Sequence, residues 1–174
     1  NTFRQYNISD LLPRDTPAEP TWNNLVTDLE RLLTKINPSI IVTPNPLTDG
    51  SPDHQFTTLA LLEALQRISS IQGSLYLYTV HSAYTTRWPF GTEESTVSLP
   101  PFFSKLSFFE KIYALHLSSD VYNRKFFALD DLHVAIPMRK FLRMDELFFV
   151  TPVKEASALR EMFLGNFALK DQVP

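Results

Sequence analysis

The sequence predicts an α/β fold, a Rossmann-like three-layer sandwich with a mostly parallel sheet, and two observations carry that prediction. Segments whose apolar residues recur at helical spacing alternate with short runs rich in β-branched residues. Between residues 21 and 80 the order is helix, strand, loop, helix, strand, which is typical of such layered sheets. We expect a single domain over residues 1–174, because a chain of this length normally folds around one core.

The first half of the chain contains the clearest elements. The segment "TWNNLVTDLERLLTKI" places apolar residues three and four apart, so it predicts a helix with Thr21 as its N-cap. "SIIVTP" is a short β-branched run and predicts a buried strand over 40–43. The spacing of apolar residues predicts a second helix over 55–68 that begins right at His54. "SLYLYTVH" predicts another strand, over 75–80.

The second half has weaker patterns. "SAYTTRWPFGTEESTVSLPP", residues 82–101, predicts a long loop over the rim of a site, with a short edge strand at 96–99. The pattern S-x-x-E that begins at Ser107 resembles a capping box and predicts a helix through about Ser118. "ALDDLHVAIPMRKFLRMDELFFV" predicts an amphipathic segment that Pro137 breaks, and "EASALREMFLGNFAL" predicts a terminal helix.

Composition excludes several classes of function. The formal charge is -3 and no long basic run occurs, so nucleic acid is not an expected partner. The absence of cysteine excludes disulfides, thiol catalysis and Cys-ligated metal, so any metal must sit on His, Asp or Glu. No apolar run approaches the roughly 18 residues of a membrane span, and the first residues do not resemble a signal peptide. We expect a soluble protein and favour the cytoplasm over secretion.

The loop after the first predicted strand contains the residues that point to chemistry. Asp49, Asp53 and His54 follow that strand directly, and ligands in open α/β sheets bind beyond the carboxyl ends of strands. The positive end of a helix favours anions and a neutral imidazole, which can coordinate a metal. The alternative is that Asp53 only caps the helix and that His54 is a solvated residue of its first turn.

Other candidate residues follow from position. His81 ends the second predicted strand and could face the same cleft. Trp88 in the long loop could stack on a sugar ring or pin the loop to the body. For His116 and His133, structural or surface roles are expected. A further group is expected to be solvated surface: Arg139, Lys140 and Arg143.

The sequence does not match the motifs of two other functional classes, the serine hydrolases and the nucleotide-binding proteins. Gly50-Ser51-Pro52 lacks the second glycine of a G-x-S-x-G elbow and places proline where an oxyanion hole needs a backbone donor. The four glycines are never clustered, so a glycine-rich nucleotide loop is excluded.

The pattern T-P-N-P-x-x-D-G-S-P-D-H-x-x-x-x-x-A-x-x-E-A, from Thr43 to Ala64, resembles the second signature of the PIG-L/LmbE family of zinc-dependent N-deacetylases. That family carries H-P-D-H in this loop. Upstream, "LERLLTKINPSIIVTPNP" is similar to the family's helix, proline and strand that lead into the site. Downstream, "KIYALHLSS" resembles its late helix and "RMDELFFV" its closing Glu-x-Phe element, so the resemblance extends from Asp28 to Phe149.

The resemblance implies roles for three residues. His54 matches the histidine that is a zinc ligand in the family, and Asp53 matches the acid that supports the site by hydrogen bonding. Ser51 stands where the family has the histidine next to the substrate carbonyl. A hydroxyl can hydrogen bond an oxyanion but cannot deliver a proton near neutral pH, so we expect a lower rate.

The family's other signature, A-H-P-D-D-E, is absent from these 174 residues. In the family it supplies two zinc ligands and the general-base Asp. The chain also lacks an initiating Met, so we expect the C-terminal portion of a larger deacetylase-like domain with an incomplete N-terminal part. The missing groups would then come from an N-terminal segment outside this sequence or from a second chain.

The implied function is a zinc-dependent hydrolase that removes an acetyl group from an N-acetylglucosamine-type conjugate. Catalytic zinc needs about three protein ligands and lowers the pKa of a bound water to about 7, which prepares it to attack the acetamide carbonyl. The expected substrate cleft includes Asp49, His81 and Trp88. The alternative is a non-catalytic carbohydrate-binding or assembly module that retains the deacetylase fold, and Ser51 is the residue that favours it.

Overall fold

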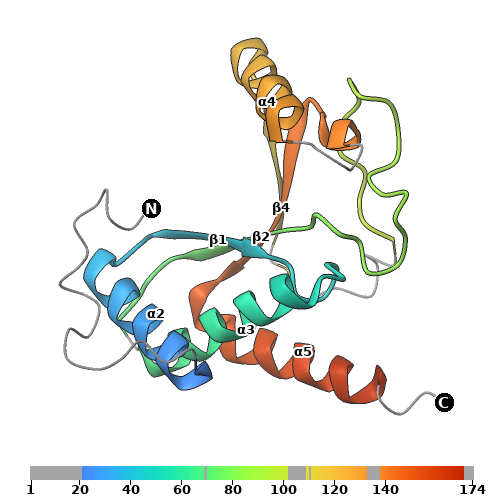
Figure 1. Ribbon diagram of the computed structural model, residues 1–174. Coiled ribbons are helices and arrows are strands. Elements are labelled where there is room, and N and C mark those ends of the chain that lie inside the picture. Colours follow the sequence, from blue (N-terminus) through green and yellow to red (C-terminus); the bar gives the residue numbers. More distant parts are fainter. Residues whose placement is uncertain (1–20, 69, 102–108, 110, 133–137, 171–174) are drawn as a thin grey trace.

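The computed structural model describes residues 21–68, 70–101, 109, 111–132 and 138–170, and these form a mixed α/β structure (Figure 1). The described part contains four α-helices, four strands and two short 3-10 helices. In chain order they are α2 (Trp22–Ile36), β1 (Ile40–Pro44), α3 (Pro52–Arg67), β2 (Ser74–Tyr78), β3 (Lys111–His116), α4 (Ser119–Leu132), η2 (Met138–Phe141), β4 (Asp145–Pro152), η3 (Val153–Glu155) and α5 (Ala156–Lys170).

The sheet is mixed, with strand order β1-β2-β4-β3. β1 pairs in parallel with β2, whereas β4 runs antiparallel to both β2 and β3. The α/β class is therefore confirmed, but the expectation of a mostly parallel sheet is wrong. The reason is that β4 enters between β2 and β3 from the opposite direction, and no local pattern in the sequence encodes that direction.

The first half follows the predicted order. The side chain of Thr21 accepts a hydrogen bond from the backbone N–H of Asn24, which confirms Thr21 as the N-cap of α2. α2 ends at Ile36, and its C-cap Asn37 adopts the left-handed conformation (φ 47°) that commonly terminates helices. α3 begins at Pro52, two residues before the predicted start, because proline is favoured at the first helical position.

The core lies between the sheet and three helices. Leu75 and Leu77 alternate along β2 and are fully buried, and Phe149, the partner of Leu77 on β4, is also buried. α3 packs between α2 and α5 and contacts β1, and Figure 1 shows α2, α3 and α5 on the same side of the sheet. α4 stands apart, next to the start of β4 (Figure 1). The ends of β1 and β2, which lead into the candidate site, therefore lie on a packed layer of helices.

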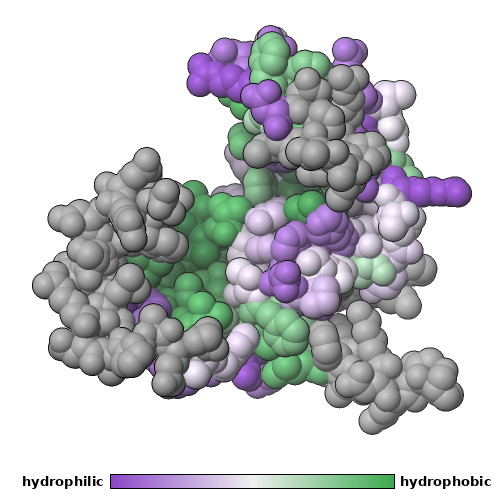
Figure 2. Space-filling view, in the orientation of Figure 1, coloured by the Kyte–Doolittle hydropathy of each residue, from purple (hydrophilic) through white to green (hydrophobic). Residues whose placement is uncertain are grey.

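Apolar surface gathers around β1 and α2 (Figure 2). Ile40 and Val42 on the edge strand β1 are 56% and 57% exposed. On α2, three large apolar side chains are also exposed: Trp22, Leu25 and Ile36. β1 is an edge strand in the described sheet, so its outer backbone groups have no strand partner among the described residues.

Several expectations for the second half are wrong. Residues 111–116, expected within a helix, form β3, because pairing of Ile112 with Phe149 and of Tyr113 with Phe148 aligns them with β4. Residues 96–99 form no strand. α4 includes part of the segment expected to be one amphipathic stretch, while the expected break at Pro137 lies outside the described residues. The terminal helix is confirmed as α5.

Within the described ranges, no helix combines the length and apolar character needed to cross a membrane.

Candidate functional site

The loops that follow β1 and β2 are joined where the two parallel strands end. The N–H of Gly50 donates to the carbonyl of His81 at 2.5 Å, and the N–H of Ala83 donates to the carbonyl of Thr48 at 2.9 Å. A Cβ on Gly50 would meet the backbone Cα of Ala83 at 2.8 Å, so glycine permits this close approach. The carboxyl ends of both strands therefore present their loops as one surface.

Asp49 holds this surface together. Its carboxylate is fully buried and accepts from three backbone N–H groups: Ser51 at 3.0 Å on Oδ1, and Val80 at 2.8 Å and His81 at 3.1 Å on Oδ2. A buried carboxylate is costly unless such donors surround it. One side chain from the β1 loop thus fixes the backbone of the β2 loop.

His54 lies beside that carboxylate in the first turn of α3. Its Nδ1 is 3.2 Å from Asp49 Oδ1, but the alignment does not make a hydrogen bond, and this buried nitrogen has no hydrogen-bond partner in the described part of the chain. The side chain is 29% exposed. Because Nδ1 is the buried nitrogen, Nε2 is the one left for a ligand. A carboxylate behind a histidine is the usual arrangement for a metal-binding imidazole.

His81 joins the same cluster. Its ring stacks on that of His54, with centroids 5.3 Å apart and an angle of 27° between the planes. The structure thus places His81 beside His54, and its role in a substrate cleft stays a prediction. The His54 ring comes from the first turn of α3 and the His81 ring from the loop after β2, whose backbone N–H at His81 donates to Asp49.

Ser51 and Asp53 lie near the cluster but have different surroundings. Ser51 is the N-cap of α3 by backbone conformation, yet its hydroxyl makes no capping hydrogen bond, so it is available to a ligand. Asp53 is an exposed first-turn residue, and its backbone carbonyl accepts from the Thr57 hydroxyl. The carboxylate next to His54 belongs to Asp49, which the sequence analysis predicted only as a residue of the substrate cleft.

The cluster does not form a complete metal centre by itself. Over the described ranges, no group of three or more His, Asp or Glu side chains is arranged to hold a metal ion. Both oxygens of Asp49 already accept backbone hydrogen bonds. His54 is therefore suited to be one ligand, and any metal there would need further ligands.

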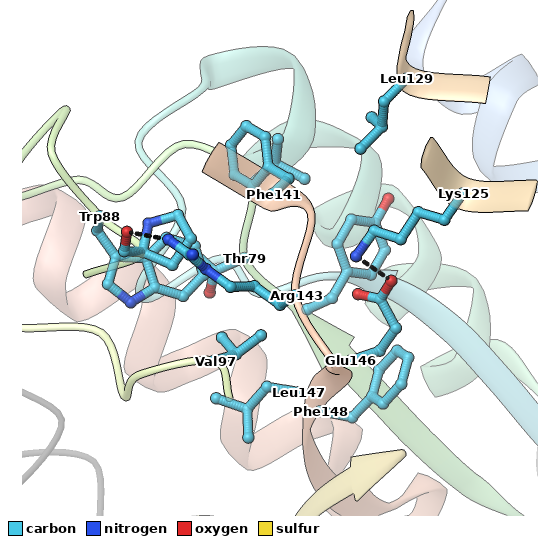
Figure 3. Close-up of a pocket in the computed structure, with 13 residues that line it drawn as sticks. Thr79, Trp88, Val97, Lys125, Leu129, Phe141, Arg143, Glu146, Leu147 and Phe148 are labelled. Carbon is cyan, nitrogen blue, oxygen red and sulfur yellow. Dashed lines mark hydrogen bonds and ion pairs between the residues drawn. The ribbon is translucent and has the colours of Figure 1, made fainter. Parts of the chain in front are cut away.

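A cavity of about 340 Å³ adjoins the site at the end of β2 (Figure 3). Val80 connects the two features, because it lines the cavity while its N–H donates to Asp49. Burial raises the pKa of Tyr78, another lining residue, and the negative charge of Asp49 raises that pKa further. The charge of Asp49 therefore acts on one residue of the cavity wall, Tyr78.

Trp88 lines this cavity and is not free to stack on an exposed ligand. It is buried, and its indole N–H donates to the carbonyl of Ser98 at 2.9 Å. Of its two expected roles, pinning the long loop is the one its contacts support.

The expectation that Arg143 is solvated surface is wrong. Only 2% of it is exposed, and its guanidinium donates to the backbone carbonyls of Pro89, Gly91 and Thr92. Lys140 instead reaches the carbonyl of Thr86. His116, expected on a helix, is exposed on β3, and His133 lies outside the described residues.

Comparison with protein-family models, curated proteins and solved structures found no match to this chain.

Sequence reasoning missed two features. Asp49 as the neighbour of His54 could have been suspected from T-D-G, since an acid before a glycine at a strand end often accepts backbone N–H groups. The burial of Arg143 left no local signal, because its acceptors lie about fifty residues earlier in the chain.

Proposed function

We propose that this chain is part of a zinc-dependent hydrolase that removes an acetyl group from an N-acetylglucosamine-type conjugate. The observation that carries the proposal is the placement of His54 Nδ1 3.2 Å from the buried Asp49 carboxylate at the carboxyl ends of β1 and β2. The resemblance of residues 43–64 to the PIG-L/LmbE signature supports the same chemistry. The proposal includes the Rossmann-like architecture of that family.

The residues of this chain have separate tasks in the proposal. The carboxylate of Asp49 lies next to Nδ1 of His54 and would stabilise the imidazole when Nε2 acts as a ligand. The Ser51 hydroxyl donates a hydrogen bond to the oxygen of the substrate carbonyl as negative charge develops on it. His81 supports the His54 ring by stacking. A bound zinc would supply Lewis-acid activation of the water nucleophile.

The remaining groups of the site come from outside this sequence in our proposal. A catalytic zinc needs about three protein ligands, and His54 is one. The other ligands and the general base are proposed to belong to an N-terminal segment or to a second chain.

The test measures zinc and activity on natively purified protein that contains this chain. We expect about one zinc per molecule by elemental mass spectrometry, with the intact mass recorded on the same sample, and deacetylation of an N-acetylglucosaminide. His54→Ala should lose both. His116→Ala is the matched control, because His116 is exposed on β3 at the other edge of the sheet. Full zinc content and activity in His54→Ala would refute the proposal.

A second candidate is a non-catalytic carbohydrate-binding or assembly module. Ser51 favours it, because the hydroxyl at this position cannot deliver a proton near neutral pH. This candidate predicts binding of N-acetylglucosaminides without zinc and without turnover. Isothermal titration in the presence of a chelator separates the two functions.

A further inference from the structure

The cavity at the end of β2 has the features of a small-ligand site. Its volume of about 340 Å³ lies at the lower end of the range of small-molecule pockets, which is about 300–1,000 Å³. Most of its wall is apolar, and the side chains come from the long loop, α4, η2 and β4. Those used in the argument are Trp88, Leu129, Phe141 and Phe148. A wall of this composition suits the aromatic or aliphatic body of a small molecule.

The charged part of the wall is net positive. Arg143, Lys125 and Glu146 line the cavity, so the described lining contains two cations and one carboxylate. Lys125 and Glu146 neutralise each other through an ion pair of 2.6 Å. Figure 3 shows Arg143 extending toward Trp88, with the Lys125–Glu146 pair on the other side of the view. Among the charged side chains that line the cavity, Arg143 is therefore the one without an oppositely charged partner in the described residues.

Arg143 also has an unusual environment for a cation. Only 2% of its surface is exposed, and the hydrogen-bond acceptors described for its guanidinium are neutral backbone carbonyls. No carboxylate lies within ion-pair distance of it in the described residues, and its buried Nε has no hydrogen-bond partner there. Buried charges are normally paired, because removal from water is costly. An anion in the cavity would supply the missing charge.

We propose that this cavity binds a small organic carboxylate with an apolar body, with Arg143 providing the electrostatic attraction. The apolar body lies against Trp88 and Phe141, and the carboxylate faces the guanidinium side of the wall. This inference goes beyond the proposed function, because it requires neither zinc nor His54.

The competing explanation is that Arg143 only holds the long loop through its three carbonyl contacts. In that case the cavity would accept apolar molecules without regard to charge. The two explanations differ in how a charged ligand compares with a neutral ligand of equal size.

The test is isothermal titration of the full chain with 3-phenylpropionate in metal-chelating buffer, and 3-phenylpropionamide is the neutral control. We expect saturable one-to-one binding of the carboxylate and weaker binding of the amide, by about tenfold or more. Absence of carboxylate binding, or equal binding of the two compounds, would overturn the proposal.

Three variants test whether the carboxylate binds in this cavity. Arg143→Gln should bring the affinity for the carboxylate close to that for the amide. Because this substitution alters a buried residue, Leu129→Trp provides an independent variant that fills the cavity from α4 and should abolish binding. Leu164→Trp, on the exposed surface of α5, is the matched control and should bind normally. Undiminished binding in a folded Leu129→Trp variant would place the ligand elsewhere and overturn the proposal.

Discussion

The buried carboxylate of Asp49 lies 3.2 Å from Nδ1 of His54 and also accepts a hydrogen bond from the backbone of His81. One buried side chain therefore lies next to two histidines that are 27 residues apart in the chain. The rings of His54 and His81 stack beside it, with their centroids 5.3 Å apart. Four predictions test the site and the layer beneath it.

Asp49→Asn should destabilise the protein. An amide has one acceptor oxygen where the carboxylate has two, so its NH2 group would face a backbone donor and at least one backbone N–H would lose its partner. We expect a loss of about 2–3 kcal/mol in the free energy of unfolding, measured by urea denaturation. Asp53→Asn is the control, and because Asp53 is exposed in a first helical turn it should cost at most about 1 kcal/mol. Equal losses would show that Asp49 does not hold the two loops together.

Gly50→Ala should also be destabilising. The added Cβ would lie 2.8 Å from the backbone of Ala83, and a backbone atom cannot move aside as a flexible side chain can. We expect a cost of about 1–3 kcal/mol from this overpacking. Gly165→Ala is the matched control, because no described atom beyond its chain neighbours and the backbone of α5 itself lies within 4 Å of that Cβ position. The control should be neutral or stabilising by up to about 1 kcal/mol, since alanine is the better helix former. Thermal unfolding of both variants measures whether each substitution lowers or raises the stability of the protein.

Glu63 should make stability depend on acid pH. It accepts from Trp22 and Arg67 and pairs with Arg160, so it links α2, α3 and α5. The hydrogen bond from Trp22 is the main cause that lowers the pKa of Glu63 below its ordinary value of 4.5. Because the folded-state pKa is lowered, the stabilising effect is complete above 4.5 and is lost as the pH falls through the folded-state value.

The measurement for Glu63 compares the wild type with Glu63→Gln by urea denaturation at a series of pH values. We expect the variant to be less stable by about 1–2 kcal/mol at neutral pH. The difference should shrink below pH 4.5. Glu161→Gln, at an exposed position on α5, should show little difference from wild type at any of these pH values. A difference for Glu63→Gln that is the same at every pH would contradict the assigned cause.

Ser51→His tests the proposed chemistry. An imidazole at this position could donate a proton as well as a hydrogen bond, so we expect deacetylation to rise by about 10²-fold or more. Zinc content should remain unchanged, because Ser51 is not assigned as a ligand. Ser51→Ala is the paired variant and should lower the rate by removing the hydrogen-bond donor. No turnover in any of these proteins, combined with zinc-independent sugar binding, would favour the non-catalytic module.

Local sequence patterns were sufficient to predict a helix or strand where the spacing of apolar residues fits only one of the two. The stripe of apolar residues and the Thr21 cap predicted α2. The β-branched run "SIIVTP" predicted β1, and the run "SLYLYTVH" predicted β2. Local patterns failed at residues 111–116, whose apolar residues fit both a helix and a strand. Pairing with β4 along the whole of β3 decides between the two.

The sequence by itself therefore determined the α/β class, the elements between residues 21 and 78, and the concentration of Asp49, Ser51, Asp53 and His54 in one short stretch of chain. Only the tertiary structure decided the mixed direction of the sheet, the choice of Asp49 as the neighbour of His54 and the burial of Arg143. The physical reason is the distance along the sequence between the residues that interact. Helix caps and periodicity depend on residues a few positions apart, whereas a strand's direction and the partners of a buried charge depend on segments that meet only after the chain has folded.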